Sequence, residues 1–420
     1  MDGSPAATDQ LRLLIVSMYP YPHASPPANY IQRVARGLRR LGHDVLIIAP
    51  QQAGKASPAE GHDRFGTSYV CFAVPVKRRW TPYYPHMLRW VRPQLLQTLA
   101  RVLSESQKGK WDAALLLGDS WWILDPVRRL CQSHDLRVAP LTTEWPPPTL
   151  SGLAGLSWFD QWMFRRNTCR RSDGIVGISR LWAEFAARHG VPAVVLPAFS
   201  KYADDELPPI DERANPRFKI VYVGRWVRRE LPCTLLRGLE LALERGVDLE
   251  MVVLGPAGLG LSWSQRAEER PAMRFLDRSP RVRERVTLMG WLADDQFERE
   301  MAAADAFVLL RPDSRQTRAL FPTRLPEFLA TGKPLILADA GDLTLYLKHF
   351  DSAYIIPAGD QPAALAEALA FLASNRDRAA EIGRGGRAAI QNAFSQTLLA
   401  GRAVDFIRGL RPPSAVARSI

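Results

Sequence analysis

The chain has 420 residues, of which 47% are hydrophobic and 23% are charged, and its formal net charge is +12. A chain of this length exceeds one hydrophobic core, so we expect two or three domains. The composition is that of a soluble globular protein and excludes a disordered or fibrous one. The positive charge fits a polyanion, an anionic membrane surface or a phosphorylated substrate as the partner.

The sequence carries no pattern of export or of a membrane span. Its apolar stretches fall short of the about 18 residues expected of a transmembrane helix. The opening residues, MDGSPAATDQ, hold acids where a signal peptide holds bases. The cysteines, which show neither a CxxC pair nor metal-ligand spacing, are Cys71, Cys131, Cys169 and Cys233. We expect a reduced cytoplasmic protein without structural zinc, and leave open a peripheral position on the inner face of the membrane.

Buried strands alternate with amphipathic helices through the first half of the chain. The segment LRLLIVS (11–17) is a continuous apolar strand, and NYIQRVARGLRRLG (29–42) places its apolar residues on one helix face. Strands that are apolar throughout are buried on both faces, as in a parallel sheet covered by helices. Further strands are expected at 43–50, 112–119, 137–144, 172–179 and 192–199.

The same alternation begins again after a polar, proline-rich stretch without any period. We interpret 1–203 as the first domain, 204–216 as a linker and 217–395 as the second domain. An amphipathic helix (396–410) and a loose tail (411–420) follow. The sequence thus predicts two Rossmann-like, doubly wound parallel-sheet domains. We expect them to face an interdomain cleft at the carboxyl ends of their strands, where ligands of such sheets bind.

Four segments, in this order, resemble the family 4 retaining glycosyltransferases and together cover nearly the whole chain. The first runs from the opening strand through GHDVLIIAP, and the second is FKIVYVGRW (218–226). The third is VTLMGWLADDQFEREMAAADAFVLL (286–310), and the fourth is FPTRLPEFLATGKPLILAD (321–339). The resemblance implies the GT-B fold, with a nucleotide-sugar donor on the second domain and the acceptor on the first. It also implies that 396–410 cross back onto the first domain.

The resemblance further implies where the donor binds. Glu327 matches the glutamate that accepts hydrogen bonds from the donor ribose, and Arg225 matches the arginine that grips the diphosphate. Backbone N–H groups at Thr323, Arg324 and Leu325 would hold the diphosphate, and Arg324 could supply a full charge. The alternative for Glu327 is a surface acid that favours a helix N-terminus. The alternative for Arg225 is a strand-end arginine paired with a nearby acid.

Two positions depart from the family pattern. Where the family usually carries a lysine after the arginine, this chain has Glu230, so Arg228 or Arg229 would have to replace that cation. An acid beside the diphosphate would be harmful because like charges repel. Where the family often has a further glutamate, this chain has Ala319.

Other residues of the second domain are expected to line the donor. Asp313, Ser314 or Gln316 could take over contacts to the donor sugar that Ala319 cannot make. The resemblance also places Gly224, in VYVGRW, and Gly290, in VTLMGW, in segments that contact the nucleotide largely through backbone.

Two acids of the first domain are candidates for handling the acceptor. Asp119 ends the strand DAALLLGD, and Glu144 ends the strand RVAPLTTE. Both fall at carboxyl ends of predicted strands, where either could orient the acceptor hydroxyl or take up its proton. The alternative is that each is a loop acid that caps the following helix.

The segment PVKRRWTPYYPHMLRWVRPQLL (75–96) mixes cations with Trp80, Tyr83, Tyr84 and Trp90. Such a mixture suits contact with an anionic membrane, which is coherent with the lipid-linked acceptors of many relatives. The alternative is an exposed loop and helix with one packed aromatic side. Stacking on nucleic-acid bases is not expected, because nothing else resembles a nucleic-acid module.

The sequence therefore predicts a glycosyltransferase that moves a sugar from a nucleotide-sugar to a glycan, lipid-linked or small-molecule acceptor. Retention is implied by the resemblance. No DxD motif lies in a fitting context, so we expect neither a metal nor another cofactor. Two alternatives stay open. A non-catalytic relative would bind nucleotide-sugar or partners without transfer or hydrolysis, and a nucleotide-sugar epimerase would convert the donor with no acceptor present.

Overall fold

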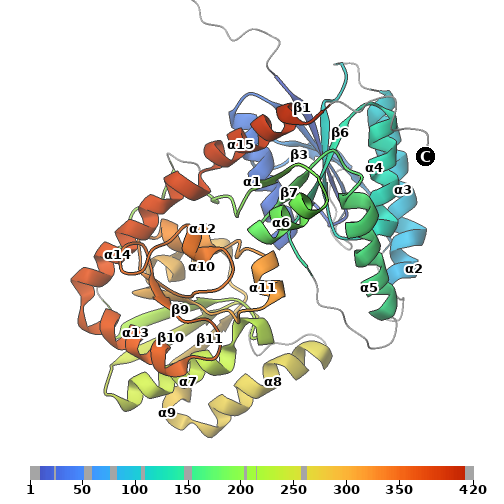
Figure 1. The fold of residues 1–420 in the computed structure, drawn as a ribbon. Helices are drawn as coiled ribbons and strands as arrows, with labels where there is room; N and C mark the ends of the chain where they lie inside the picture. Colours follow the sequence, from blue (N-terminus) through green and yellow to red (C-terminus); the bar gives the residue numbers. More distant parts are fainter. Residues whose placement is uncertain are drawn as a thin grey trace, which may run out of the picture. The chain divides into compact units, whose positions relative to one another are not determined.

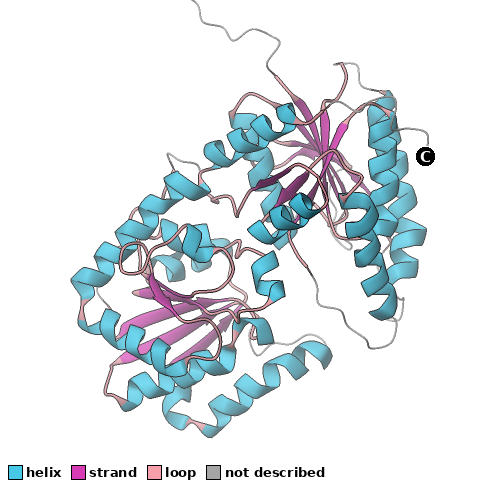
Figure 2. Cartoon of the chain, in the orientation of Figure 1, coloured by secondary structure: helices cyan, strands magenta, loops and turns pink. Residues whose placement is uncertain are grey.

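The computed structural model describes residues 10–411, apart from 23–24, 52–58, 76–82, 106–108, 146–153, 203–205, 214 and 257–262. The chain divides into two compact units (Figures 1 and 2). Unit 1 consists of Met1–Phe199 with Gln396–Ile420, and unit 2 consists of Ser200–Ser395. Each unit is a sheet of mainly parallel strands covered by helices, so the predicted doubly wound fold is confirmed.

In the described part of unit 1, the sheet has eight strands in the order β3-β4-β2-β1-β5-β6-β7-β8. Neighbouring strands are parallel except at the edge, where β3 runs antiparallel to β4. The central residues Leu13–Val16 of β1 are fully buried, as the unbroken apolar run predicted. The strands are β1 (Arg12–Ser17), β2 (Asp44–Pro50), β3 (Glu60–His62), β4 (Ser68–Phe72), β5 (Ala113–Leu117), β6 (Arg137–Thr142), β7 (Ile175–Gly177) and β8 (Ala193–Val195).

Helices cover both faces of this sheet (Figure 1). They include two short π-helical segments, η1 and η2, which continue α2 and α5. The helical elements are α1 (Pro26–Arg40), α2 (Tyr83–His86), η1 (Met87–Val91), α3 (Arg92–Ser104), α4 (Trp121–Ser133), α5 (Ala154–Met163), η2 (Phe164–Cys169), α6 (Arg180–Arg188) and α15 (Gln396–Gly409).

The described residues of unit 2 form a sheet of six parallel strands in the order β11-β10-β9-β12-β13-β14. The strands are β9 (Phe218–Val223), β10 (Leu249–Leu254), β11 (Val286–Gly290), β12 (Ala306–Leu309), β13 (Leu335–Ala338) and β14 (Tyr354–Ile356). The helical elements are η3 (Arg228–Glu230), α7 (Pro232–Glu244), α8 (Trp263–Arg278), α9 (Pro280–Arg283), α10 (Asp294–Ala302), α11 (Arg315–Ala319), α12 (Leu325–Ala330), η4 (Leu343–Leu345), α13 (Pro362–Ser374), α14 (Arg376–Ala389) and η5 (Ile390–Phe394).

The segment predicted as a linker, 204–216, belongs to unit 2 in the structure. Its backbone is held by side chains of that unit: Lys333 donates to the carbonyl of Asp211, and Arg387 donates to the carbonyl of Pro208. The proline-rich composition predicted an irregular chain but could not show that unit 2 would bind it. The first unit accordingly ends at Phe199 rather than at residue 203.

Helix α15 packs against α1 within unit 1 (Figure 1). The close approach depends on Gly37 of α1, where a Cβ atom would lie 2.7 Å from the carbonyl oxygen of Gln396 and 3.0 Å from Ala400 Cβ. A glycine on the contacting face lets two helix backbones come together. The last helix of the chain is therefore part of the first unit's fold.

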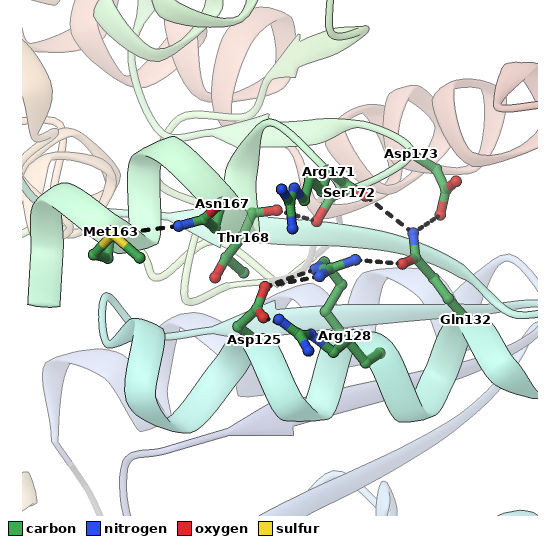
Figure 3. Close-up of polar contacts among 10 residues, drawn as sticks. Asp125, Arg128, Gln132, Met163, Asn167, Thr168, Arg171, Ser172 and Asp173 are labelled. Atoms are coloured by element: carbon green, nitrogen blue, oxygen red, sulfur yellow. Dashed lines mark hydrogen bonds and ion pairs between the residues drawn. The ribbon is translucent and has the colours of Figure 1, made fainter. Parts of the chain in front are cut away.

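A polar network, buried at Asp125 and Arg128, joins α4 to the segment that follows η2 (Figure 3). The Arg128 guanidinium donates to Asp125 Oδ1 over 2.8 and 3.0 Å and to Gln132 Oε1 over 2.6 Å. Gln132 Nε2 in turn donates to the carbonyl of Arg171 and to Asp173 Oδ2. The network fixes the chain just after η2, and hence the continuous helix of α5 and η2, against α4.

Replacing Asp125 by alanine is expected to destabilise unit 1 by about 3–5 kcal/mol, because it leaves the buried Arg128 cation uncompensated. Urea unfolding measures this, and the transition of unit 2 should not move. The matched control is Arg129→Ala, which removes the other partner of Asp125. Its guanidinium is largely exposed, so its loss should cost under about 1 kcal/mol. Equal costs for the two variants would contradict the account.

Candidate functional site

The carboxyl ends of β9 and β12 carry an arginine each. From β9 the chain winds through β10 to β11, and from β12 it winds the other way through β13 to β14. Ligands of doubly wound sheets bind where the winding reverses, which here is between β9 and β12. Arg225 follows β9 and Arg311 follows β12. Each has a buried Nε atom without a hydrogen-bond partner among the described residues, so each keeps an unused donor at this point.

Arg225 is anchored at its backbone and half-exposed at its tip. The neighbouring Trp226 is fully buried, and the Tyr222 hydroxyl donates to the carbonyl of Arg225 over 2.9 Å. Its Nη2 lies 3.4 Å from Oε1 of Glu269, a buried residue of α8. An acid thus stands beside Arg225, as the alternative interpretation expected. The contact is long, and the guanidinium is 33% exposed and within reach of an anion.

Glu230, the residue that departs from the family lysine, is paired with Arg311. Their atoms Oε1 and Nη1 lie 2.9 Å apart, and both side chains are largely buried. Arg229 Nε lies 4.0 Å from the same oxygen. The repulsion that an acid would cause here is offset because a cation arrives from the neighbouring strand. The sequence suggested Arg228 or Arg229 as the replacement cation, and Arg311 is the residue in close contact.

Three adjacent strand ends carry glycines, which form a bare backbone edge. Gly224 follows β9, Gly255 follows β10, and Gly290 ends β11. Gly224 N–H donates to the carbonyl of Leu254, and Gly255 N–H donates to that of Gly290, each over 2.9 Å. Gly255 has a φ of +115°, and a Cβ there would lie 2.9 Å from the Gly224 oxygen. Side chains are thus excluded beside Arg225, so a flat ligand group could approach the backbone closely.

Glu327 lies in the first turn of α12, as predicted. Its side chain is mostly buried and lies 3.7 Å from Nη1 of Arg324, the residue that precedes the helix. The helix has only six residues, and the N–H of Leu325 donates to the carbonyl of Pro322. The Leu325 N–H is therefore not available to a diphosphate in this structure. Arginine side chains would offer a diphosphate stronger, charged hydrogen bonds than this N–H could.

The residues before α12 are placed less favourably for a sugar contact. Ser314 caps α11 by accepting from the Thr317 N–H over 3.1 Å. Asp313 is exposed and lies 4.0 Å from the Arg318 guanidinium, and Ala319 is fully buried. Ser314 thus has a structural role, while Asp313 keeps a carboxylate in solvent.

Unit 1 places Asp119 at its own reversal of winding, which falls between β1 and β5. Asp119 follows β5, and Tyr19 follows β1. The Tyr19 hydroxyl and Gln161 Nε2 each donate to the Asp119 carboxylate over 3.4 Å. Burial, followed by the negative charge of Glu144, raises the pKa of Asp119 to about 6. A carboxyl group with this pKa can take up a proton near neutral pH.

Glu144 follows β6 and is exposed, and its charge reaches Asp119. A second acid, Asp160 of α5, lies beside the pair. Its carboxylate accepts from the Trp122 N–H over 2.9 Å, and burial raises its pKa to about 6. Asp160 thus caps α4, the role that the alternative interpretation gave to Asp119 and Glu144.

Sequence reasoning missed Arg311, Tyr19 and Asp160. Arg311 could have been found, because it follows a buried strand directly in AFVLLR, as Arg225 does in VYVGR. Tyr19 has the same position after β1. Asp160 had no such pattern, since it lies within a helix and reaches the site only through the fold.

Two family models match the chain. Residues 27–198 match the one described as a glycosyl transferase 4-like domain, and residues 217–375 match the one described as glycosyl transferases group 1. The chain belongs to the family 4 glycosyltransferases. A stretch of 200 residues of this glycosyltransferase is 28% identical to a GDP-mannose-dependent alpha-(1-6)-phosphatidylinositol monomannoside mannosyltransferase of Mycobacterium tuberculosis. That match covers 47% of the chain, and the chain spans about half (49%) of the relative's length.

Solved structures show the same fold over nearly the whole glycosyltransferase. Sucrose-phosphate synthase from Thermosynechococcus elongatus superposes with a TM-score of 0.68 at 15% identity, over 96% of this chain and 99% of that one. The trehalose-6-phosphate synthase OtsA gives 0.69 at 13% identity, over 96% and 100%. HepE of Anabaena in complex with UDP gives 0.64 at 13% identity, over 95% and 100%. The fold of the glycosyltransferase is therefore GT-B.

Proposed function

We propose that this glycosyltransferase transfers a hexose, with retention, from a nucleoside diphosphate sugar bound to unit 2 onto a lipid-linked or glycan acceptor bound to unit 1. The observation that carries the proposal is the pair of arginines at the reversal of winding in unit 2. Within the described part of the chain, Arg225 and Arg311 each keep a buried Nε donor without a partner there. Two cations beside a bare glycine edge suit a diphosphate whose nucleoside lies flat against backbone.

The chemistry follows from where charge develops. As the bond between the sugar and the β-phosphate breaks, negative charge gathers on the departing diphosphate, and a fixed guanidinium lowers that barrier. Arg225 is the nearer cation to the glycine edge, because it follows Gly224 directly. Since two arginines supply positive charge, we propose that transfer needs no metal ion. Activity should therefore persist in excess EDTA.

The acceptor hydroxyl must lose a proton as it attacks the sugar. We propose that Asp119 orients this hydroxyl and takes up its proton, with Tyr19 and Gln161 holding the carboxylate. Glu144 stands at the exposed rim and tunes the Asp119 pKa upward. The mannosyltransferase relative is named for a glycolipid acceptor, which supports a lipid-linked acceptor here.

A transfer assay tests the proposal. The full chain is incubated with labelled GDP-mannose, UDP-glucose and other common nucleotide-sugars, each with and without glycolipid or polyprenyl phosphate-linked acceptors. GDP and UDP donors come first, because the mannosyltransferase relative is named as GDP-mannose-dependent and the structurally similar HepE was solved in complex with UDP. Labelled product that requires an acceptor is expected. Binding without transfer would favour a non-catalytic relative, and conversion of the donor without acceptor would favour an epimerase.

Replacing Glu327 by alanine is expected to weaken donor binding about 10- to 100-fold, because two ribose hydroxyls lose a charged hydrogen-bond partner. Thermal unfolding with the matching nucleoside diphosphate measures this. Ligand at about 100 times the wild-type dissociation constant adds about 2.7 kcal/mol to the wild-type free energy of unfolding, and the same concentration should add only about 0.4–1.4 kcal/mol in the variant. Glu367→Ala, which removes an exposed acid of α13 in the same unit, is the control. An equal gain in Glu327→Ala and wild type would exclude the ribose role.

A further inference from the structure

Helix α5 has its polar and apolar sides in the reverse of the usual arrangement. Its polar residues face the rest of unit 1: Asp160 accepts from the Trp122 N–H, Gln161 donates to Asp119, and Ser157 is hydrogen-bonded to Tyr84. The large apolar residues lie at spacings of three and four on the opposite side, and each is exposed. We call this side the outer face of α5, and it consists of Leu156, Trp158, Phe159 and Trp162. A surface helix normally buries its apolar side.

The outer face is a connected aromatic surface. Trp158 and Trp162 stack with their rings 6.2 Å apart and nearly parallel, yet they remain 46% and 37% exposed. Phe159 contacts Trp162 and, at its inner edge, Trp121 and Trp122 of α4. Half of the exposed large hydrophobic residues in the described part of the chain belong to this one helix. An exposed apolar cluster of this size is unfavourable in water, so we expect a binding partner to cover it.

The charges around the outer face are positive. Within 154–171, the acid Asp160 is buried, while arginines follow at 165, 166, 170 and 171. Arg166 lies over the Trp162 ring at 5.3 Å, and Arg89 lies over Trp90, a further exposed indole, on η1. Tryptophan beside arginine is the pairing that suits the interface of a bilayer, where the indole enters the headgroup layer and the guanidinium meets lipid phosphate.

We propose that the outer face of α5 docks unit 1 onto an anionic lipid bilayer. The occupant is a membrane because the surface is aromatic, runs along one helix and is rimmed by exposed cations, with no exposed acid on the same segment. Among the described residues no helix is long and apolar enough to cross a bilayer. The sequence had placed a membrane contact on 75–96; of that segment, Trp80 lies outside the described residues, and the stronger surface is α5.

The same short helix joins the bilayer to the acceptor site. Its outer face would lie in the headgroup layer while Gln161, on its inner face, holds the Asp119 carboxylate. A lipid-linked acceptor could then present its sugar to Asp119 while its lipid stays in the membrane. In this respect the inference rests on the proposed function, although the docking itself does not.

Co-sedimentation of the full chain with vesicles tests the proposal. Wild type is expected to bind phosphatidylcholine vesicles that contain phosphatidylglycerol. It should bind vesicles of pure phosphatidylcholine more weakly, and high salt should weaken its binding to the anionic vesicles. The double variant Trp158→Ser/Trp162→Ser should bind at least about tenfold more weakly, because it loses both stacked indoles. The matched control is Trp291→Ser, which removes a still more exposed indole from unit 2 and should leave vesicle binding unchanged.

A second measurement distinguishes an error in the docking proposal from an error in the proposed donor site. The double variant should keep its thermal stabilisation by a nucleoside diphosphate, which shows that it folds and that unit 2 works. The proposal is overturned if wild type does not bind anionic vesicles, or if the double variant binds them as tightly as wild type. It is also overturned if light scattering shows a dimer that the double variant abolishes, since a second copy would then be the occupant.

Discussion

Replacing Arg225 by alanine is expected to lower the rate of sugar transfer about 10²- to 10³-fold, the usual cost of removing one preorganised donor to developing charge. The guanidinium stands at the reversal of winding, and its buried Nε has no partner among the residues that the structure describes. The Arg225 backbone is held by the buried neighbour Trp226 and by the Tyr222 hydroxyl. Donor affinity should fall as well, because the diphosphate is charged before the bond breaks. Steady-state rates at varied donor concentration measure both effects.

The control for this prediction is Glu269→Gln, which removes the acid beside Arg225 and keeps the cation. If Arg225 acts on the donor, this variant should retain activity within about an order of magnitude. If Arg225 serves chiefly to neutralise the buried Glu269, the double variant Arg225→Ala/Glu269→Gln should recover most of the lost rate. Such recovery would contradict a direct role in transfer.

The same logic decides what Arg311 does. Arg311→Gln alone leaves Glu230 buried without its close partner, so a loss of activity in that variant is ambiguous. The double variant Arg311→Gln/Glu230→Gln removes both charges and keeps the shape of the pair. We expect its donor binding to stay impaired, because we propose that Arg311 also contacts the diphosphate.

Replacing Asp119 by asparagine is expected to lower the transfer rate about 10²- to 10⁴-fold, the range found for a positioned general base. Asparagine keeps the size of the side chain and can still contact Tyr19 and Gln161, so the loss should lie in the proton transfer rather than in folding. Donor binding to unit 2 should be unchanged, and thermal stabilisation by the nucleoside diphosphate checks this. A variant with wild-type rates would remove Asp119 from the mechanism.

The role of Asp119 also predicts how the transfer rate depends on pH. Burial and then Glu144 raise the Asp119 pKa to about 6, so the carboxylate is ionised above that pH and protonated below it. The rate at low acceptor concentration should fall about tenfold for each pH unit below about 6. Glu144→Gln removes the repelling charge and should move this decline to lower pH. A decline at the same pH in Glu144→Gln would contradict the coupling.

The carboxyl ends of the central strands were the most predictable part of the site. The unbroken apolar runs before Asp119 and Arg225 indicated buried parallel strands, and in such a sheet a polar residue just after a strand lies at the ligand edge. Glu327 was equally easy to predict, because a short helix with an acid in its first turn follows a recognisable segment. The sequence around each residue was therefore enough to place these positions at a strand end or a helix start.

The partners of these residues could not be predicted, because they come from distant parts of the chain. Glu230 is neutralised by Arg311, which lies 81 positions further along, and only the adjacency of β9 and β12 brings them together. For the same reason the sequence could not show that the apolar side of α5 is the exposed one. The polar residues of α5 have their partners in α2, α4 and the loop after β5. A period analysis of one helix cannot show which side meets the sheet.

Calorimetric titration with a nucleoside diphosphate and with the matching nucleoside tests the central claim most directly. The claim is that Arg225 and Arg311 hold the donor diphosphate at the reversal of winding between β9 and β12. Wild type should bind the diphosphate at least about tenfold more tightly than the nucleoside, since two charged hydrogen-bond donors are in play. In Arg225→Ala combined with Arg311→Gln and Glu230→Gln, this preference should disappear. A preference that survives in the combined variant would place the diphosphate elsewhere and contradict the account.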